Sequence, residues 1–250
     1  GPFGEDGQVQ KILKKNKIKF THSNVQSSKN CFNKFITKKL VIKNNILTPK
    51  FIIIKKKNIN VEKLYELKEK FIKFVLKPVK SGSSFGIVII KNNLEFKKFI
   101  KRIEIFKSDL FEHDEVMVEE YILGKELTVS TIKFTKKTHA LAITEIKCKN
   151  KFFDYQAKYS KGYSKHILPA KIDKKKYNEC MNLAVRLHNL LKCNSIARSD
   201  FILNNVNNKI YFLETNTQPG LTSVSLFPEQ AEYKNISFKD IVTGILKKTN

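Results

Sequence analysis

Two acidic residues and an asparagine near the C-terminal end have the chemistry to hold a metal ion. Glu214 and Asn216 end an apolar segment two residues apart, so on a strand their side chains share a face. Asp200 lies in the preceding apolar segment, and the Asn-rich turn 204–208 predicts a hairpin that brings it beside Glu214. Carboxylate and amide oxygens suit Mg²⁺, which takes its remaining ligands from water and nucleotide phosphates. A plain hairpin with solvated acids is the alternative.

A second group of residues has the character of a phosphate site. Lys77 ends a predicted strand and precedes a loop of glycines and serines at 80–86. Such a loop can place backbone N–H groups and hydroxyls over phosphates while lysines neutralise their charge. The order of a Walker loop is absent, and a flexible linker is the alternative. Arg198 shares a predicted strand face with Asp200 and would add a fixed positive charge there.

Two further segments are weak signals alone and are informative only in combination with these sites. Residues 116–126 form a strand, a short link and a second strand, in which the link could bind an adenine edge and Glu126 the ribose hydroxyls. Surface-facing glutamates are the alternative. Residues 153–160 place Lys158 and Tyr159 at the end of an aromatic strand, and the polar stretch that follows predicts a mobile flap. Aromatic packing with a loop is the alternative there.

Composition limits the class of protein. A chain of 250 residues can bury a sizeable core in one or two domains. The net charge of +25 would attract polyanions, but the lysines are spread along the chain, often beside Asn, and no zinc-finger or RNP-type motif accompanies them. Nucleic-acid binding is therefore disfavoured. The apolar runs are too short to span a bilayer, and four cysteines without C-x-x-C spacing are typical of reduced intracellular thiols.

The periodicity of the chain predicts α+β layers rather than regular βαβ alternation. A Ser-rich connection is expected at 23–28. The predicted helices are 7–17, 30–44, 61–70, 95–107, 174–192 and 238–248. The predicted strands are 18–20, 50–54, 74–77, 87–91, 117–120, 126–134, 141–148, a segment near Tyr155, and the hairpin 197–214.

Taken together and in order, these segments resemble the D-alanine–D-alanine ligases, a branch of the ATP-grasp superfamily. The segments that carry the resemblance are 4–7, 34–49, 77–86, 119–126, 154–159, 197–200 and 214–226. The last contains Glu-x-Asn-Thr-x-Pro-Gly-x-Thr-x-x-Ser-Leu, which is specific to this branch. The resemblance implies an α+β ATP-grasp fold whose two subdomains, 30–118 and 119–250, grip the nucleotide, with a remnant of an N-terminal α/β domain at 1–29.

The resemblance also implies which residues bind ATP. Lys34, Lys77 and Lys158 would contact its phosphates, and Ser83 and Tyr159 would link the Gly/Ser loop to the flap as it closes. Glu126 would hold the ribose. The remaining residues implied to bind the nucleotide are Ser84 in the loop, and Glu119, Glu120, Tyr121 and Ile122 around the adenine.

Metal and amino-acid sites follow from the same resemblance. Asp200, Glu214 and Asn216 would bind two Mg²⁺ ions, with Mn²⁺ as a substitute. Arg198 would stabilise the negative oxygens of an acyl phosphate and of the tetrahedral species that follows it. The carboxylate of the second amino acid would lie at Ser225 and Leu226.

Family chemistry joins two D-alanines in two steps: one carboxylate takes the γ-phosphate of ATP, and the amine of the second D-alanine then displaces phosphate. The alternatives are an ATP-grasp ligase with other amino-acid specificity, a nucleotide-binding protein without turnover and, least favoured, a nucleic-acid-binding protein. A homodimer is left open. The resemblance implies a cytoplasmic or organellar stroma-like compartment and no membrane association.

The N-terminal region departs from the family. The motif that follows the family's N-terminal domain stands here at residues 1–7, so we expect a fragment that binds ATP but is a poor ligase on its own. Asn33 stands where Asp usually precedes the first lysine, and His22 and Asn24 replace glycines. These changes concern the first amino acid rather than the nucleotide and metal sites.

Overall fold

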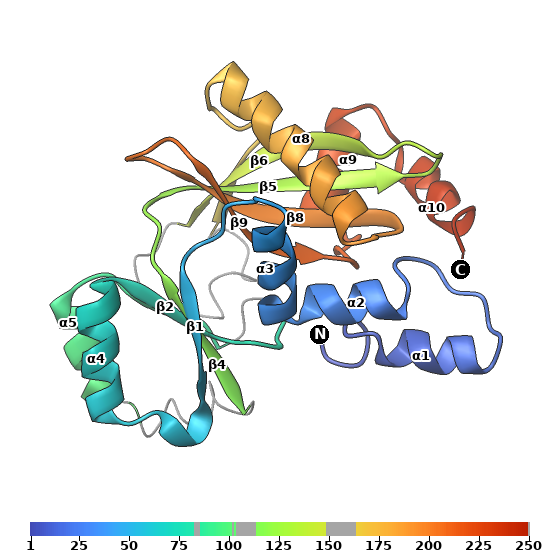
Figure 1. The fold of residues 1–250 in the computed structure, drawn as a ribbon. Helices are drawn as coiled ribbons and strands as arrows, with labels where there is room; N and C mark the ends of the chain where they lie inside the picture. Colours follow the sequence, from blue (N-terminus) through green and yellow to red (C-terminus); the bar gives the residue numbers. More distant parts are fainter. Residues whose placement is uncertain (83–85, 102, 104–113, 149–163, 250) are drawn as a thin grey trace.

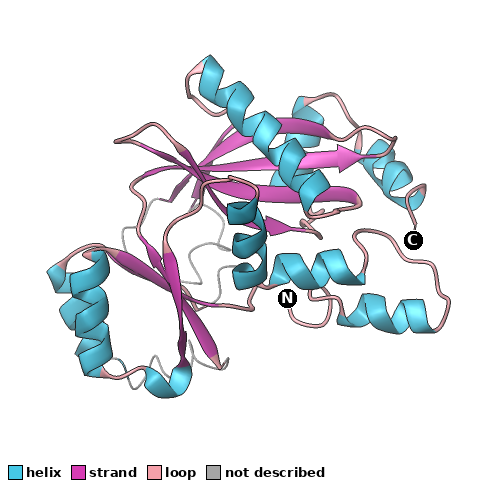
Figure 2. Ribbon diagram, viewed as in Figure 1, coloured by secondary structure: helices cyan, strands magenta, loops and turns pink. Residues whose placement is uncertain are grey.

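The structure, a computed structural model, describes residues 1–82, 86–101, 103, 114–148 and 164–249. Two antiparallel sheets with helices packed against them form the molecule, which confirms the predicted α+β class (Figures 1 and 2). No helix in the described part of the chain is long and apolar enough to cross a membrane.

The smaller sheet has the strand order β1-β4-β2-β3, and its neighbours pair antiparallel. Alternation along its strands separates two faces. Phe74 and Leu76 of β2 and Val116 and Val118 of β4 face a core shared with two helices. The elements of this unit are β1 (Phe51–Lys55), the 3₁₀ turn η1 (Lys56–Asn58), α4 (Val61–Phe71), β2 (Phe74–Pro78), β3 (Val88–Ile90), α5 (Asn93–Lys101) and β4 (Glu115–Glu120).

The larger sheet has the order β7-β6-β5-β8-β9 and is covered on both faces (Figure 2). On one face a single core joins α8 to α2 and α3, and on the other face α9 and α10 pack over part of the sheet. Its strands are β5 (Gly124–Lys133), β6 (His139–Cys148), β7 (Ser164–Ile167), β8 (Ser195–Asn204) and β9 (Ile210–Asn216). Its helices are α8 (Lys174–Leu190), α9 (Leu226–Tyr233) and α10 (Phe238–Leu246).

Three helices precede the smaller sheet in the chain, the second of which contacts β9, and several predictions for this region are wrong. Residues 18–20, all described, form no strand. The Ser-rich connection 23–28 is partly helical because the side chain of Asn24 accepts a hydrogen bond from Ser27 N and caps a helix. Asn33 is extended and splits the predicted 30–44 helix, since its side chain caps the second half. The helices are α1 (Gln8–Lys15), α2 (Val25–Phe32) and α3 (Lys34–Lys43).

Besides the short 3₁₀ turn η1, one strand and one helix were not predicted. The strand β7 falls in the stretch that sequence analysis assigned to the end of a flap. The helix α9 begins at Leu226, a few residues after the Pro219-Gly220 turn, and contains Pro228 in its first turn, a position that helices tolerate. The predicted strand near Tyr155 lies outside the described residues. Predicted elements elsewhere are confirmed within a few residues, except that the end of the predicted helix 95–107 lies outside the described residues. Ser237 caps α10 through a capping box with Asp240.

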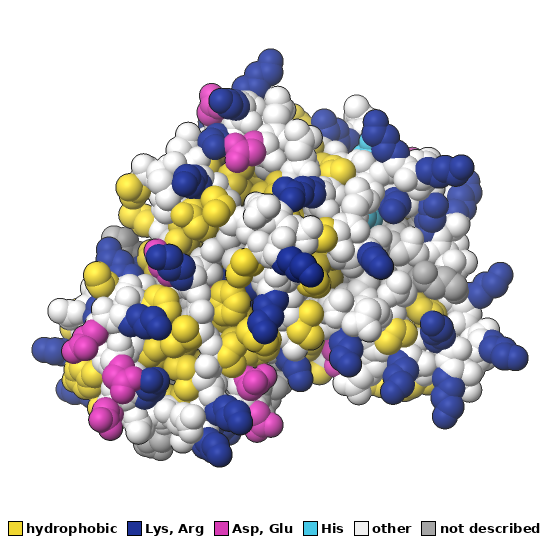
Figure 3. Space-filling view, viewed as in Figure 1, with side chains coloured by type: hydrophobic (Ala, Val, Ile, Leu, Met, Phe, Trp, Pro, Cys, Tyr) yellow, Lys and Arg dark blue, Asp and Glu magenta, His cyan; other side chains and the backbone are white. Residues whose placement is uncertain are grey.

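Basic side chains are spread across the molecule. On the face shown in Figure 3, lysines and arginines are scattered over all the visible elements rather than gathered in one stripe. This distribution agrees with the sequence-based interpretation that the excess charge is a general property of the solvated surface.

Gly124 tests how closely two neighbouring strands of the larger sheet approach each other. It begins β5 and pairs with Asn204 of β8, and a Cβ on it would lie 2.1 Å from the carbonyl oxygen of Leu203. We expect Gly124→Ala to lower the free energy of unfolding by about 1–3 kcal/mol in urea, because the backbone would have to shift. The control is Gly4→Ala, where nothing in the described part of the chain lies within 4 Å of the new Cβ. Equal stability of the two variants would contradict this packing.

Candidate functional site

A carboxylate and a lysine face each other on the side of the smaller sheet that is turned away from α4 and α5. Lys77 of β2 and Glu119 of β4 are diagonal neighbours, because Val75 pairs with Glu119 and Lys77 pairs with Met117. The Lys77 Nζ lies 2.7 Å from Glu119 Oε2. Both side chains are buried, with 7% of the Lys77 side chain and 3% of the Glu119 side chain exposed. Burial favours a tight pair, since an isolated charge would be costly there.

The helix α3 adds a second lysine to this carboxylate. Lys38 is fully buried, and its Nζ lies 2.7 Å from Glu119 Oε1. Burial lowers the pKa of Lys38 to about 8, against the opposing attraction of Glu119. Burial would raise the pKa of Glu119, but the two lysines outweigh it and hold that pKa below its usual value. A buried carboxylate thus stands between two buried ammonium groups.

One turn earlier on α3, Lys34 connects this cluster to the larger sheet. Its Nζ donates to the Ser81 carbonyl oxygen at 2.6 Å and lies 3.5 Å from Glu214 Oε2. Burial lowers the pKa of Lys34, and Glu214 opposes that shift. Lys38 also donates to Thr48, whose hydroxyl donates to the Phe212 carbonyl of β9 at 2.9 Å. The lysines of α3 therefore contact both sheets.

The hairpin β8–β9 brings the predicted metal-binding residues to one face. Asp200 pairs with Glu214, and Arg198 pairs with Asn216, and directly opposed residues point to the same side. A register shift beside Asp200 matters here, because Phe212 faces the core while Glu214 faces the other way. The predicted proximity of Asp200 and Glu214 is therefore confirmed.

Asp200 is held from two sides. Thr128 of β5 donates its hydroxyl to Asp200 Oδ1 at 2.6 Å. The Arg198 guanidinium donates through Nε to Oδ1 at 3.1 Å and through Nη2 to Oδ2 at 3.0 Å. Asn216 Oδ1 accepts from Gln218 N at 2.8 Å. In the described ranges there is no group of three or more Asp, Glu, His or Cys side chains that could hold a metal, so an ion here would need the amide of Asn216 and ligands from outside the protein.

The helix α9 presents the predicted amino-acid site at its N-terminus. Ser225 is the N-cap residue, but its side chain makes no cap and instead bonds with the Thr222 hydroxyl at 2.8 Å. Leu226 is the first helical residue. Gln230 anchors α9 to β5, accepting from Ser130 N at 2.8 Å and donating to the Thr128 carbonyl at 3.1 Å. Thr128 therefore ties Asp200 and α9 to the same point of β5.

The residues predicted to bind adenine and ribose lie in the link between the sheets and in the strands on either side of it. Glu120 N donates to Lys50 O at 2.8 Å and Tyr121 N donates to Lys73 O at 3.1 Å, so these two groups are used within the protein. Ile122 is buried. Glu126 lies on β5 two residues before Thr128, and hence on the face that carries Asp200. The predicted residues Ser83, Ser84, Lys158 and Tyr159 lie outside the described residues.

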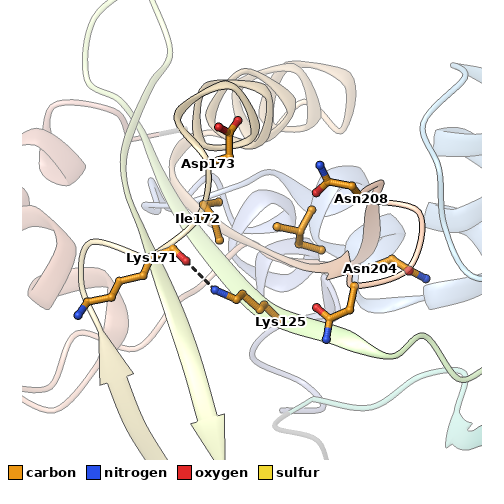
Figure 4. A pocket seen from close by; sticks show the side chains of 8 residues that line it. Lys125, Lys171, Ile172, Asp173, Asn204 and Asn208 are labelled. Atoms are coloured by element: carbon orange, nitrogen blue, oxygen red, sulfur yellow. Dashed lines mark hydrogen bonds between the residues drawn. The ribbon is translucent and has the colours of Figure 1, made fainter.

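An open hollow of about 560 Å³ lies elsewhere (Figure 4). Lys125, Asp173 and Asn204 line it, and Lys125 Nζ donates to the Lys171 carbonyl at 2.6 Å. Leu203, which also lines it, belongs to the α8 side of the sheet, whereas Asp200 belongs to the opposite side. This hollow is therefore separate from the site described above.

Comparison with known proteins now decides the family. The model for the "D-ala D-ala ligase C-terminus" family matches residues 40–247. A D-alanine–D-alanine ligase from Pelagibacter ubique is 40% identical over 251 aligned residues, which cover 99% of this chain and 77% of that protein. The chain belongs to the D-alanine–D-alanine ligase family.

Solved structures agree with this membership and confirm the ATP-grasp fold. The D-alanine–D-alanine ligase from Bacillus anthracis has a TM-score of 0.78 and 30% identity over 99% of this chain and 76% of that chain. A second structure of that enzyme is a complex with ATP. The VanG D-Ala:D-Ser ligase from Enterococcus faecalis has a TM-score of 0.80 and 30% identity over 97% of this chain and 68% of that chain.

Three residues of the site were missed in the sequence. Lys38 was only part of a motif, and its burial depends on Glu119, which is 81 positions away in the chain. Thr128 and Gln230 have no local signature. Strand alternation places Thr128 on the face of Glu126, which was the one signal that pointed to it.

Removing the central carboxylate tests the charge cluster. We expect Glu119→Gln to lower the free energy of unfolding by about 3–5 kcal/mol at pH 7, because Lys38 and Lys77 would stay buried without a counter-charge. The depressed pKa of Glu119 means that its contribution is present above the usual carboxyl pKa of 4.5 and is lost as the pH falls through the folded-state value. Urea unfolding at several pH values measures both effects.

The matched control is Glu120→Gln, because Glu120 is the next residue of the strand and is only partly buried. It should change stability little. A loss of equal size in both variants, or a Glu119→Gln effect that grows on acidification, would contradict the assigned pairing.

Proposed function

We propose that this protein is an ATP-dependent ligase that joins two D-alanine molecules through an acyl phosphate. The observation that carries the proposal is the contact between Lys34 and Glu214, 3.5 Å apart. It brings the lysines suited to phosphates next to the oxygen ligands suited to a divalent cation. A nucleotide phosphate bridging the two would satisfy both sets of charges.

In this proposal the nucleotide lies between the subdomains 30–118 and 119–250. Lys34 and Lys77 contact phosphate oxygens, together with Lys158, Ser83 and Ser84. Glu126 holds the ribose. Because Glu120 N and Tyr121 N are already bonded within the protein, adenine recognition falls to other groups around Ile122. Glu119 serves the nucleotide through its lysines rather than by touching the adenine, since both its oxygens face ammonium groups.

The donor set fits magnesium. Asp200, Glu214 and Asn216 offer two carboxylates and an amide oxygen on one face, and a carboxylate oxygen retains acceptor capacity beyond its present bonds. We assign two Mg²⁺ ions to these residues. When bound, such ions would neutralise charge on the transferring phosphoryl group. Thr128 fixes the orientation of Asp200 for this task.

Arg198 and α9 complete the proposed chemistry. The Arg198 guanidinium, held by Asp200, presents a fixed positive charge for the oxygens of an acyl phosphate and of the tetrahedral species. The carboxylate of the second amino acid lies at Ser225 and Leu226, where backbone N–H groups at a helix N-terminus favour an anion. Tyr159 joins the flap to the Gly/Ser loop. These contacts hold the amine and the activated carbonyl in line.

The amino-acid choice has a second candidate. The chain resembles the D-Ala:D-Ser ligase as closely as it resembles the B. anthracis enzyme, with 30% identity to each. D-serine is therefore the alternative second substrate. D-alanine and D-serine are compared directly as second substrates in the same assay.

Turnover tests the proposal. We expect ADP and phosphate to be released, at the low rate expected of a poor ligase, when D-alanine is added to the protein with ATP and Mg²⁺, and mass spectrometry to detect the D-alanyl-D-alanine product. A larger yield with D-alanine plus D-serine would favour the alternative substrate. ATP binding without ADP release under either condition would instead support a nucleotide-binding protein without turnover.

Metal binding is tested apart from turnover. With Mn²⁺ as a magnetic substitute, we expect Asp200→Asn to weaken ATP-dependent ion binding about a hundredfold, because a charged ligand is lost. Water-proton relaxation measures the bound ion. The control is Asp114→Asn, an exposed aspartate directly before β4. Unchanged relaxation in Asp200→Asn would remove this residue from the metal site.

A further inference from the structure

Lys38 is a fully buried lysine that, in the described part of the chain, touches none of the groups proposed to hold substrate. Its ammonium contacts Glu119 and Thr48, and the Phe51 ring lies 5.5 Å from its Nζ. A residue that only filled space at this position would be apolar, because burying a lysine is costly even when it is paired. The charge of Lys38 therefore has a role beyond filling space.

The charged groups around Lys38 come from both sheets and from its own helix. The neighbouring carboxylates attract it, whereas Lys77 repels it. The charged groups that face it are Glu119 from β4, Lys77 from β2 and Glu214 from β9, with Lys34 one turn earlier on its own helix.

The Glu119 carboxylate decides how much charge Lys77 can offer. Its two oxygens are divided between two lysines, Oε1 with Lys38 and Oε2 with Lys77, both at 2.7 Å. With both lysines charged, the trio carries one positive charge in excess. Without Lys38, Glu119 would be neutralised by Lys77 alone, and the pair would offer no net charge to an anion.

We propose that Lys38 is a positioning residue for nucleotide phosphates, which neutralises Glu119 so that Lys77 keeps a positive charge available to the phosphate. This inference rests on the proposed function, in which Lys77 contacts ATP. Lys38 acts through Glu119 and does not itself reach the ligand. Its bond to Thr48, which is tied to the Phe212 carbonyl, fixes the ammonium relative to β9 as well.

A binding experiment separates the effect of the Lys38 charge from the effect of its packing. We expect Lys38→Met to weaken ATP binding about tenfold or more, measured by calorimetry with Mg²⁺, because one charge close to the phosphates is lost. Binding of adenosine, measured by ligand-observed NMR, should stay within about twofold, because adenosine has no phosphate. The control is Lys43→Met, the same change at an exposed position of α3.

The pH dependence provides a second readout. The pKa of Lys38 is about 8, so raising the pH through that value removes the excess charge, and wild-type affinity for ATP should fall between about pH 7 and 9. Lys38→Arg keeps its charge over this range, so its affinity should fall less steeply. Lys34, whose pKa is also lowered, is present in both proteins and contributes to both slopes.

The outcomes are distinct. If the wild-type protein does not bind ATP, the proposed function fails. If it binds ATP and Lys38→Met binds ATP equally well, or loses ATP and adenosine in equal measure, the positioning role is wrong while the proposed function stands. If Lys38→Met does not fold, the pH comparison decides: a flat wild-type profile, or equal slopes for wild type and Lys38→Arg, overturns the inference.

Discussion

The burial of a carboxylate between two lysines constrains the whole arrangement around the site. Glu119, Lys38 and Lys77 come from β4, α3 and β2, and none could be buried alone without a large desolvation cost. The cluster therefore fixes the helix against the smaller sheet. Lys34 extends it to Glu214, so the position of α3 also sets the distance between the nucleotide lysines and the metal-binding hairpin.

In each sheet, one face packs in a core and the other carries polar residues of the site. In the smaller sheet, Leu76 and Val118 pack against α4 and α5 while the alternate residues Lys77 and Glu119 carry charge. In the larger sheet one face packs mainly into the core with α2, α3 and α8, and the other is shared between the packing of α9 and α10 and the polar residues of the site. Packing thus makes rigid the same strands whose other side presents the polar groups.

The sequence predicted those features that are encoded locally. The pairing of Asp200 with Glu214 followed from two apolar segments and an Asn-rich turn, and strand alternation placed Glu214 and Asn216 on one face. The register shift at Asp200 was not predictable in this way. Uninterrupted alternation would put Phe212 and Glu214 on one face, and the shift turns Glu214 and Asn216 away from the core.

Other features depend on partners far away in the chain. Lys38 looks in the sequence like one of many surface lysines, and only the distant Glu119 explains its burial. The helix α9 was hidden by turn residues before it and by Pro228 inside it, whereas it is held by contacts with the distant sheet: Phe227 packs in a core there and Gln230 bonds to β5. Asn33 was a helix residue by periodicity, but its side chain serves better as a cap.

The large net charge and the charge of the site are different in kind. Surface lysines are solvated, and salt screens their attraction beyond about 10 Å, so they raise the local concentration of anions without selecting one. The buried lysines of α3 and β2 have fixed neighbours and act in a medium that screens poorly. Each also has an acidic partner, so the charge left for a ligand is set by how those partners are shared. Selection of a phosphate therefore depends on how the buried lysines pair with carboxylates rather than on the number of lysines on the protein surface.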